Sequence, residues 1–449
     1  MKAVRIFVLL AMLFLFPPFS LAGAVMFENA SEARLANGLK VIMLENHQAP
    51  IVSFQVWYRV GAADETTGKT GLANMVERMM FKSLGPMSAQ EFIQTIRRMG
   101  GKASGTASHD YTCYCDTLAA NRIGVAIDFE AQRMRSLTVR DRDFRLEKMV
   151  VRQERRMRID DNPKSYLLEQ LYAAAFQSEP YHWPAMGWTD DLRRLTIADV
   201  RAFYSKYYHP ANAFIVVTGD FERKELLARL EQTFGKIAPG EPAPTFLIED
   251  PPQQGERIAS IRRPGQVGRM VVAWHVPNLQ STDSYALEVI KALLASGKSS
   301  RFYDDLIRQG AEVLEISAHY DLTSKNPGLF SISASFLQEK KPEEVQKAIC
   351  DELELLKTNP PSPMELKKAK NQLEASFVFK NESIISMASK LAEYEIAFDW
   401  TSISAYIPSI RSVTAQDVSR VAAKYFTEQN LTVGVATPPP PPVTTGENP

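Results

Sequence analysis

An internal repeat constrains the fold of this chain more than any other feature. The segment LTIADVRAFYSKYYHPANAFIVV (195–217) aligns without a gap with VTAQDVSRVAAKYFTEQNLTVGV (413–435). In both copies a Thr able to cap a helix precedes a helical stretch that ends in Lys and two aromatic residues, and a turn and a β-branched strand follow. Because each copy closes its half of the chain, we predict two related domains.

Composition sets the predicted boundaries of these domains. The first covers residues 25–236 and the second 257–437, and a linker over 237–256 joins them. The stretch KIAPGEPAPTFLIEDPPQQGER around this linker carries five prolines, which favours an extended connection. The polyproline tail, 438–449, is predicted to be disordered. Strands grouped with long helices, rather than strict alternation, indicate an α+β fold with mainly antiparallel sheets.

The N-terminus predicts export. Lys2 and Arg5 precede the apolar run IFVLLAMLFLF, and the small residues Ala22-Gly23-Ala24 follow after two prolines. This order is typical of a secretory signal, here residues 1–24, and the expected compartment is the periplasm. The apolar run is shorter than the ~20 residues that span a bilayer, so we expect no membrane span in the mature chain.

Charge and motif content exclude several classes of function. The chain has 52 basic and 52 acidic residues, which gives no electrostatic basis for binding nucleic acid. Its three cysteines cannot build a disulfide framework. We find no G-x-S-x-G nucleophile motif and no glycine-rich phosphate loop.

Hydrophobic periodicity predicts the elements of the first half. We expect strands over 39–46, 49–60 and 102–118, and helices over 71–83, 144–158 and 166–176. On the helix at 71–83, Asn74, Glu77 and Arg78 share the face opposite the apolar stripe, and a solvated polar face is the ordinary interpretation.

The helix at 144–158 carries a stronger signal. Leu146, Val150 and Met157 define its apolar stripe, and Glu154 falls within that stripe. A carboxylate on a buried face must be paired, protonated or bound to a metal. The alternative is a position on the rim of the domain, with one of the two arginines that follow Glu154 as a local partner.

These segments resemble the pitrilysin/insulinase family of zinc peptidases, the inverzincins, in its short two-domain, processing-peptidase-like form. The resemblance runs from about residue 30 to residue 437 and is carried by NGLKVIMLEN, VGAADETTGKTGLANMVERMMFKS, HDYTCYCDTL, VRQERRMRIDDNP and LLASGKSSRFYDDL. It implies two halves, each an antiparallel sheet with helices packed on it, which close like a clam around a peptide chamber.

The resemblance also implies a zinc motif that this chain has lost. In the family motif H-x-x-E-H, two His bind zinc and Glu is the general base. Here Asn74 and Arg78 occupy the two ligand positions, Glu77 keeps the base position, and Glu154 matches a third ligand. Asn is a poor zinc ligand and Arg is a cation, so we expect no bound zinc and an idle Glu77.

Two further positions follow from the resemblance. Ser104, Gly105, Thr106 and Ala107 match an edge strand that binds extended peptides through main-chain hydrogen bonds, although Ser-Gly replaces the usual Asn-Ala. Non-catalytic family members carry an Arg and a Tyr in the second half that grip substrate, and Ile307 and Leu314 stand there instead.

The sequence therefore predicts a non-catalytic subunit of an exported peptidase assembly, paired with a zinc-bearing family member and able to bind peptide. The alternatives are a zinc endopeptidase that uses other ligands and a structural scaffold. We also predict an ion pair between Arg78 and Glu154, shared with Glu77, that replaces the metal structurally.

Overall fold

The computed structural model describes residues 26–82, 89–242, 250–310 and 312–438. The predicted signal peptide, residues 243–249 of the predicted linker and all but the first residue of the predicted tail lie outside the described residues. Within the described part, no helix is long and apolar enough to cross a membrane.

The first half contains a six-stranded sheet with the order β1-β2-β6-β3-β5-β4. All neighbouring strands pair antiparallel except β2 and β6, which are parallel. The strands are β1 (Ser31–Arg34), β2 (Lys40–Glu45), β3 (Ile51–Tyr58), β4 (Lys102–Ala107), β5 (Thr112–Ala119) and β6 (Ala213–Gly219). The region 102–118, expected as one strand, is a hairpin: β4 and β5 are joined by a turn in which the Ser108 hydroxyl accepts hydrogen bonds from the Asp110 and Tyr111 amides.

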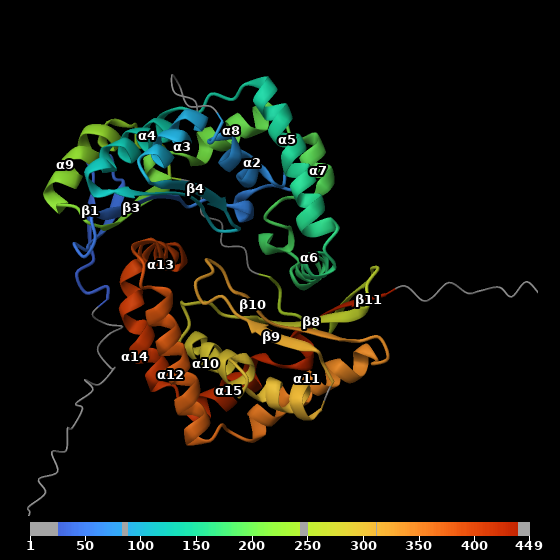
Figure 1. Cartoon of the computed structure of the whole chain (residues 1–449). Helices are drawn as coiled ribbons and strands as arrows, with labels where there is room; N and C mark the ends of the chain where they lie inside the picture. Colours follow the sequence, from blue (N-terminus) through green and yellow to red (C-terminus); the bar gives the residue numbers. More distant parts are fainter. Residues whose placement is uncertain (1–25, 83–88, 243–249, 311, 439–449) are drawn as a thin grey trace, which may run out of the picture.

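The helices of the first half cover one face of this sheet (Figure 1). They are α2 (Leu72–Met79), α3 (Ala89–Arg98), α4 (Ile123–Arg135), α5 (Asp141–Arg155), α6 (Pro163–Ala175), α7 (Thr189–Arg194), α8 (Ile197–Tyr207) and α9 (Arg223–Thr233). A π-helical turn, η4 (Arg156–Asp160), extends α5. Helix α6 is the exception, because it lies against the second half.

The second half repeats this plan with a five-stranded sheet of order β7-β11-β8-β10-β9. Its strands are β7 (Arg257–Arg262), β8 (Val267–Val276), β9 (Glu315–His319), β10 (Gly328–Leu337) and β11 (Leu431–Thr437). Its helices are α10 (Asp283–Ala295), α11 (Pro342–Thr358), α12 (Pro363–Lys380), α13 (Ile384–Ala397), α14 (Tyr406–Ser412) and α15 (Ala415–Tyr425), with a π-helical segment η8 (Tyr303–Gln309). Two related α+β halves are thus observed, as the sequence predicts.

The two copies of the sequence repeat occupy equivalent places. Helices α8 and α15 each begin with a capping box, formed by Thr196 and Asp199 in the first half and by Thr414 and Asp417 in the second. The strand that follows each helix pairs parallel with one neighbour and antiparallel with the other. The repeat therefore marks the same helix and the same strand position in both halves.

Each half contributes one helix that packs against the sheet of the other half. The apolar face of α6, with Leu167 and Leu171, packs against Val271 and Ala273 of the second sheet. In return α13 lies against β3 and β6 of the first sheet, on the face that α2, α3 and α4 leave open (Figure 1). Because both faces of the first sheet are covered, β3 and β6 are buried along almost their whole length.

A buried carboxylate on α13 anchors this helix to the first half. Glu395 of α13 is 3% exposed and accepts hydrogen bonds from the Lys40 ammonium at the start of β2 and from the Arg59 guanidinium just after β3. A buried carboxylate needs such partners, since leaving it unpaired would cost several kcal/mol, on the order of 3–5. This contact ties α13 to the first half.

The prediction that the apolar stripe of α5 is buried is wrong. Leu146, Val150 and Met157 are exposed, by 46%, 47% and 65%. The helix instead buries Phe144 and Val151, together with polar residues that have partners on neighbouring elements. A helix buries the face whose polar groups find hydrogen-bond and charge partners on neighbouring elements. In α5 that face is the more polar of the two.

Candidate functional site

Helix α2 is held by a capped N-terminus. The buried Glu65 carboxylate accepts hydrogen bonds from the amides of Gly71 and Ala73, at 2.6 and 2.7 Å. Gly71 has φ of 91°, and a Cβ there would lie 2.5 Å from Leu192 Cδ2. Only glycine adopts this conformation and fits this space without strain. The start of α2, and hence the position of its polar face, is fixed.

The polar face of α2 meets α5 through a network of charges. The Arg78 guanidinium donates a hydrogen bond to the Glu154 carboxylate and lies 3.6 Å from Glu147. Lys82 lies 2.8 Å from the other Glu147 oxygen, and Arg158 lies 2.8 Å from the other Glu154 oxygen. Three cations therefore neutralise two carboxylates at the position where the resemblance places a metal.

The predicted Arg78–Glu154 pair is thus present, but its other details differ from the prediction. Arg78 is shared with Glu147, and the described residues show no hydrogen bond or ion pair between Arg78 and Glu77. The local partner of Glu154 is Arg158, one helical turn away. Arg155 instead forms a two-pronged pair with the Glu169 carboxylate, at 2.8 and 2.9 Å. Neither Glu147 nor Lys82 was predicted, since only the packing of α2 on α5 brings them in.

Glu77 is buried beside this network rather than solvated. Burial raises its pKa to about 7, while the positive charges of Arg78 and Arg133 oppose that rise. Arg133 is itself buried, with its guanidinium over the rings of Phe81 and Tyr114 at 4.6 and 4.1 Å. The ordinary interpretation of this helix face as solvated is wrong for Glu77.

Gly105 of β4 lies in close contact with the side chains of Glu77 and Phe81. A Cβ at Gly105 would lie 2.5 Å from Glu77 Oε1 and 2.5 Å from the Phe81 ring. The Glu77 carboxylate therefore presses against the main chain of β4 where a side chain would otherwise stand. Asn74, one turn earlier on α2, has a buried Oδ1 without a hydrogen-bond partner among the described residues.

Strand β4 is the edge of the first sheet, as predicted. Within the described residues it pairs only with β5, so its outer main-chain groups are available to an added strand. Ser104 and Thr106 are exposed. Gly105, Thr106 and Ala107 also line a cavity of about 650 Å³, which Asn74, Glu77, Arg78 and Glu154 line from the other side.

Among the residues that the structure describes, all that line this cavity belong to the first half of the chain. The two second-half positions that the resemblance singles out are not brought to it. Ile307 packs against the core of the second half, and Leu314 is exposed just before β9. The second half therefore does not close this cavity.

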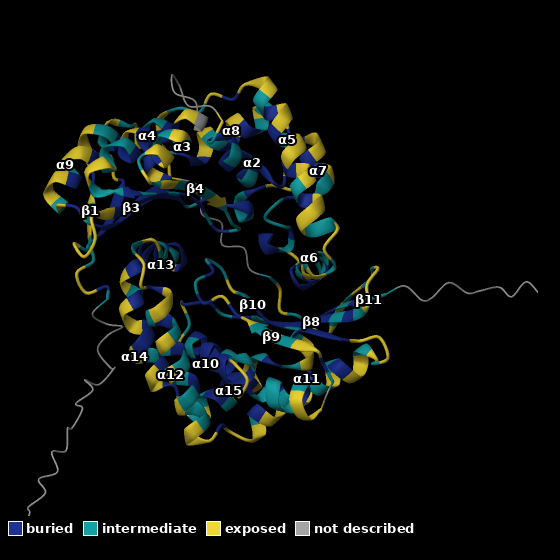
Figure 2. Cartoon of the chain, viewed as in Figure 1, coloured by how far each residue is buried: buried dark blue, intermediate teal, exposed yellow. Residues whose placement is uncertain are grey.

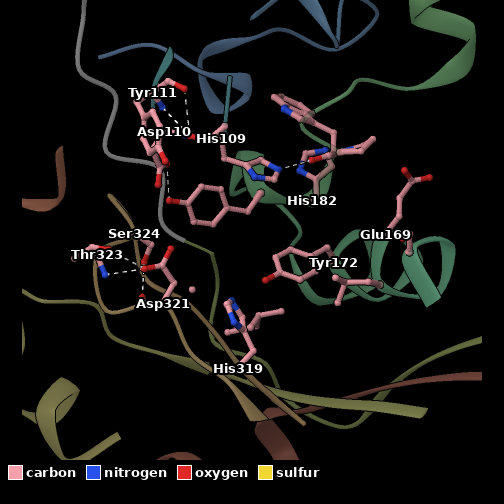
Figure 3. A pocket seen from close by; sticks show the side chains of 18 of the residues that line it. His109, Asp110, Tyr111, Glu169, Tyr172, His182, His319, Asp321, Thr323 and Ser324 are labelled. Atoms are coloured by element: carbon pink, nitrogen blue, oxygen red, sulfur yellow. Dashed lines mark hydrogen bonds between the residues drawn. The ribbon is translucent and has the colours of Figure 1, made fainter. Parts of the chain in front are cut away.

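A second cavity, of about 590 Å³, lies between the two halves (Figure 3). Tyr172, His182 and His109 face it from the first half, and His319 and Asp321 face it from the second. Its carboxylates have partners: Asp110, for example, accepts hydrogen bonds from the Tyr181 hydroxyl and the Lys325 amide, at 2.7 and 3.0 Å. These bonds join the halves where the turn after β4 begins.

Comparison with known proteins identifies the family. The family model described as "Insulinase (Peptidase family M16)" matches residues 40–187, and the model described as "Peptidase M16 inactive domain" matches residues 194–373. The zinc protease PqqE of Helicobacter pylori is 30% identical over 403 residues, which cover 89% of this chain and 90% of that protein. The chain belongs to the pitrilysin/insulinase family, peptidase family M16.

Two further comparisons extend this M16 assignment. The crystal structure of a protease from Helicobacter pylori superimposes with a TM-score of 0.87 at 28% identity, covering 91% of this chain and 99% of that one. A probable mitochondrial-processing peptidase subunit beta of Arabidopsis thaliana is 22% identical over 414 residues, covering 90% of this chain and 77% of that protein. The inactive-domain model begins at residue 194 and so includes the last part of the first half, whereas helix α2 and Glu154 lie within the residues that the insulinase model matches.

The residues of this M16 chain do not fit a catalytic zinc. Zinc takes His nitrogen, Cys sulfur or carboxylate oxygen, and a catalytic site uses three such ligands. Here two of the three positions hold Asn74 and the Arg78 cation, and the one carboxylate, Glu154, is already bonded to Arg78 and Arg158. Among the described residues no group of three or more His, Cys, Asp or Glu side chains is arranged to hold a metal.

Proposed function

We propose that this chain is a non-catalytic subunit of an exported M16 peptidase assembly, in which a related chain with an intact H-x-x-E-H motif performs the hydrolysis. The observation that carries the proposal is the bond from the Arg78 guanidinium to the Glu154 carboxylate. Without a metal-bound water there is no nucleophile for Glu77 to activate. The chain itself is proposed to bind no zinc.

Peptide binding is the activity that the remaining geometry supports. The edge of β4 offers free main-chain donors and acceptors beside the cavity of about 650 Å³. Main-chain pairing depends little on side-chain identity, so it can outlast the loss of the metal ligands. The chain would then hold a peptide in extended form for its partner.

A partner is supported by the open side of the site. The cavity is walled by the first half alone, and the second-half residues Ile307 and Leu314 lie elsewhere. A second chain would be needed to cover it. One relative, the processing-peptidase protein of Arabidopsis thaliana, is itself named as a subunit. Export to the periplasm is proposed from the N-terminal sequence alone.

Reconstitution tests this proposal. The purified chain, the related zinc-bearing chain from the same genome and their mixture are assayed on a library of quenched fluorescent peptides. We expect no cleavage by this chain alone and a gain of at least about tenfold in kcat/KM for the mixture over the partner alone, about 1.4 kcal/mol of added transition-state stabilisation. Cleavage by this chain alone, abolished by a chelator, would support the zinc endopeptidase instead.

Crosslinking separates the peptide-binding subunit from a pure scaffold. Peptides carrying a photoreactive group should crosslink to β4 residues such as Thr106, whose side chain is exposed. Crosslinks that map only to surfaces away from β4, with the same gain in activity, would favour the scaffold.

A further inference from the structure

The outward surface of α5 and the π turn after it is unusually rich in exposed apolar and basic side chains. We call it the α5 face and define it as Arg142, Arg145, Leu146, Met149, Val150, Arg152, Gln153, Arg156 and Met157, all of which are exposed. Figure 2 shows exposed residues along this helix at the edge of the first half. Four of the fourteen large apolar residues that are exposed among the described residues lie here, within residues 146–157.

Helical spacing divides the α5 face into two parallel ridges. Positions separated by four, seven and eleven residues align along a helix. Within α5, one ridge holds Arg145, Met149 and Arg152, and the other holds Leu146, Val150 and Gln153; Arg156 and Met157 follow on the π turn. Val150 also lines the cavity of about 650 Å³, so the apolar ridge forms part of its rim. The basic ridge lies on the side away from the cavity.

We propose that the α5 face is the docking surface for an acidic, apolar-centred patch of the zinc-bearing partner, which covers the cavity when it binds. This inference rests on the proposed function and names the surface that function uses. Single exposed apolar residues are ordinary, but a contiguous band of large ones bordered by Arg is typical of protein interfaces.

The charges on the face specify the partner's chemistry. Among the described residues, neither Arg142 nor Arg152 has a carboxylate within 4.0 Å. Arg145 is paired with Asp141 and Arg156 lies 3.4 Å from Asp161, both in exposed surface pairs that are worth little and that a partner's carboxylates can replace. Arginine favours the rim of interfaces because it binds carboxylates through two parallel hydrogen bonds. Carboxylates on the partner would meet the basic ridge while its apolar side chains cover Leu146, Met149 and Met157.

The same charges argue against two other occupants. A second copy of this chain, docked through the same face about a two-fold axis, would bring the basic ridge against itself, and like charges placed opposite one another weaken an interface. An anionic membrane suits a basic amphipathic helix. However, a flat lipid surface would leave the adjacent cavity unfilled, whereas a protein can insert a side chain into it.

Three variants of the full chain test the docking surface against the related zinc-bearing chain from the same genome. Arg145→Glu with Arg152→Glu reverses the basic ridge, and Met149→Gln with Met157→Gln removes apolar contacts. Lys367→Glu with Lys380→Glu is the matched control, because both lysines are exposed on α12 of the second half. Dissociation constants are measured by sedimentation velocity at about 50 and about 300 mM NaCl.

We expect the charge reversal to weaken the complex at least about tenfold and to remove most of its salt dependence. The methionine variant should weaken it about fivefold or more, and the control should stay within about twofold. Thermal melts followed by circular dichroism check that all three variants remain folded, which surface substitutions allow.

Several results would overturn the inference. A complex that forms with unchanged affinity in both α5 variants refutes the docking surface and leaves the proposed function standing. Self-association of the wild type that the α5 variants abolish would identify a second copy as the occupant. Binding to phosphatidylglycerol-containing vesicles that these variants abolish, with unchanged affinity for the partner, would identify a membrane surface. If the wild type forms no complex at all, the partner proposal fails together with this one.

Discussion

Breaking the Arg78–Glu154 contact provides the most direct energetic test of the proposed replacement for the metal. Arg78 is 24% exposed and Glu154 is 18% exposed, so water screens the pair only in part. Two unit charges 3.6 Å apart, the Arg78–Glu147 distance, attract by about 4–5 kcal/mol at the effective dielectric of a protein surface. Desolvation and the ordering of long side chains remove most of that gain.

From these terms we expect Arg78→Met to lower the free energy of unfolding by about 2–3 kcal/mol, since it leaves two carboxylates with only Lys82 and Arg158 as partners. Glu154→Gln and the double variant complete a double-mutant cycle. The coupling energy between Arg78 and Glu154 should be about 1–2 kcal/mol. Urea denaturation followed by tryptophan fluorescence and circular dichroism together gives these values and reveals any separate unfolding of the two halves.

The exposed pair Arg229–Asp128 is a matched control on the same domain. Its side chains are 44% and 55% exposed, so its coupling should stay below about 0.5 kcal/mol. A coupling for Arg78 and Glu154 no larger than that of the control would refute the argument that this pair substitutes structurally for a metal.

Three other changes have defined outcomes. Glu77 has a pKa raised by burial to about 7, so the folded chain binds a proton more tightly than the unfolded chain, and this contribution to stability is lost as pH rises from about 4.5 to about 7. Glu77→Gln should therefore flatten the pH dependence of urea midpoints and add up to about 3 kcal/mol at pH near 8; an unchanged slope would contradict the burial of that carboxylate. Gly105→Ala places a methyl group 2.5 Å from Glu77 Oε1 and should lower the free energy of unfolding in urea by about 1–3 kcal/mol. The control Ser104→Ala, at an exposed site, should lower it by less than about 0.5 kcal/mol. Equal effects of the two substitutions would contradict the close packing of β4 on α2. Glu395→Gln leaves Lys40 and Arg59 without their shared carboxylate and should lower the midpoint of thermal unfolding by several degrees, about 3 kcal/mol, with a wild-type midpoint as the contradicting result.

The parts of the fold that sequence could predict are those fixed by local chemistry. The capping boxes at Thr196 and Thr414 mark the start of the equivalent helix in each half, and the strand after each helix takes the same place in its sheet. These signals depend on neighbours a few residues away. The exchange of α6 and α13 between the halves leaves no such signal, because it depends on which sheet face remains uncovered after folding.

The candidate site likewise contains residues that the sequence could predict and residues that only the packing of the helices brings in. The positions of Asn74, Glu77 and Arg78 follow from helical spacing, and the resemblance brings Glu154 to them. Glu147 joins the network only because α5 buries its more polar face, whereas the apolar pattern of Leu146 and Val150 pointed to the opposite orientation. An amphipathic pattern identifies a helix and its stripe, but it cannot say whether the stripe meets the chain's own core or another surface.

The zinc content of the purified chain tests the central claim most directly. The wild-type chain, each single substitution Asn74→His and Arg78→His, and the double variant are exchanged into metal-free buffer, given one equivalent of zinc, and measured by mass spectrometry after gel filtration. We expect well under about 0.1 zinc per chain for the wild type and for both single variants, and about one for the double variant, in which two His join Glu154. About one zinc bound per wild-type chain, removed by a chelator together with peptidase activity, would contradict it.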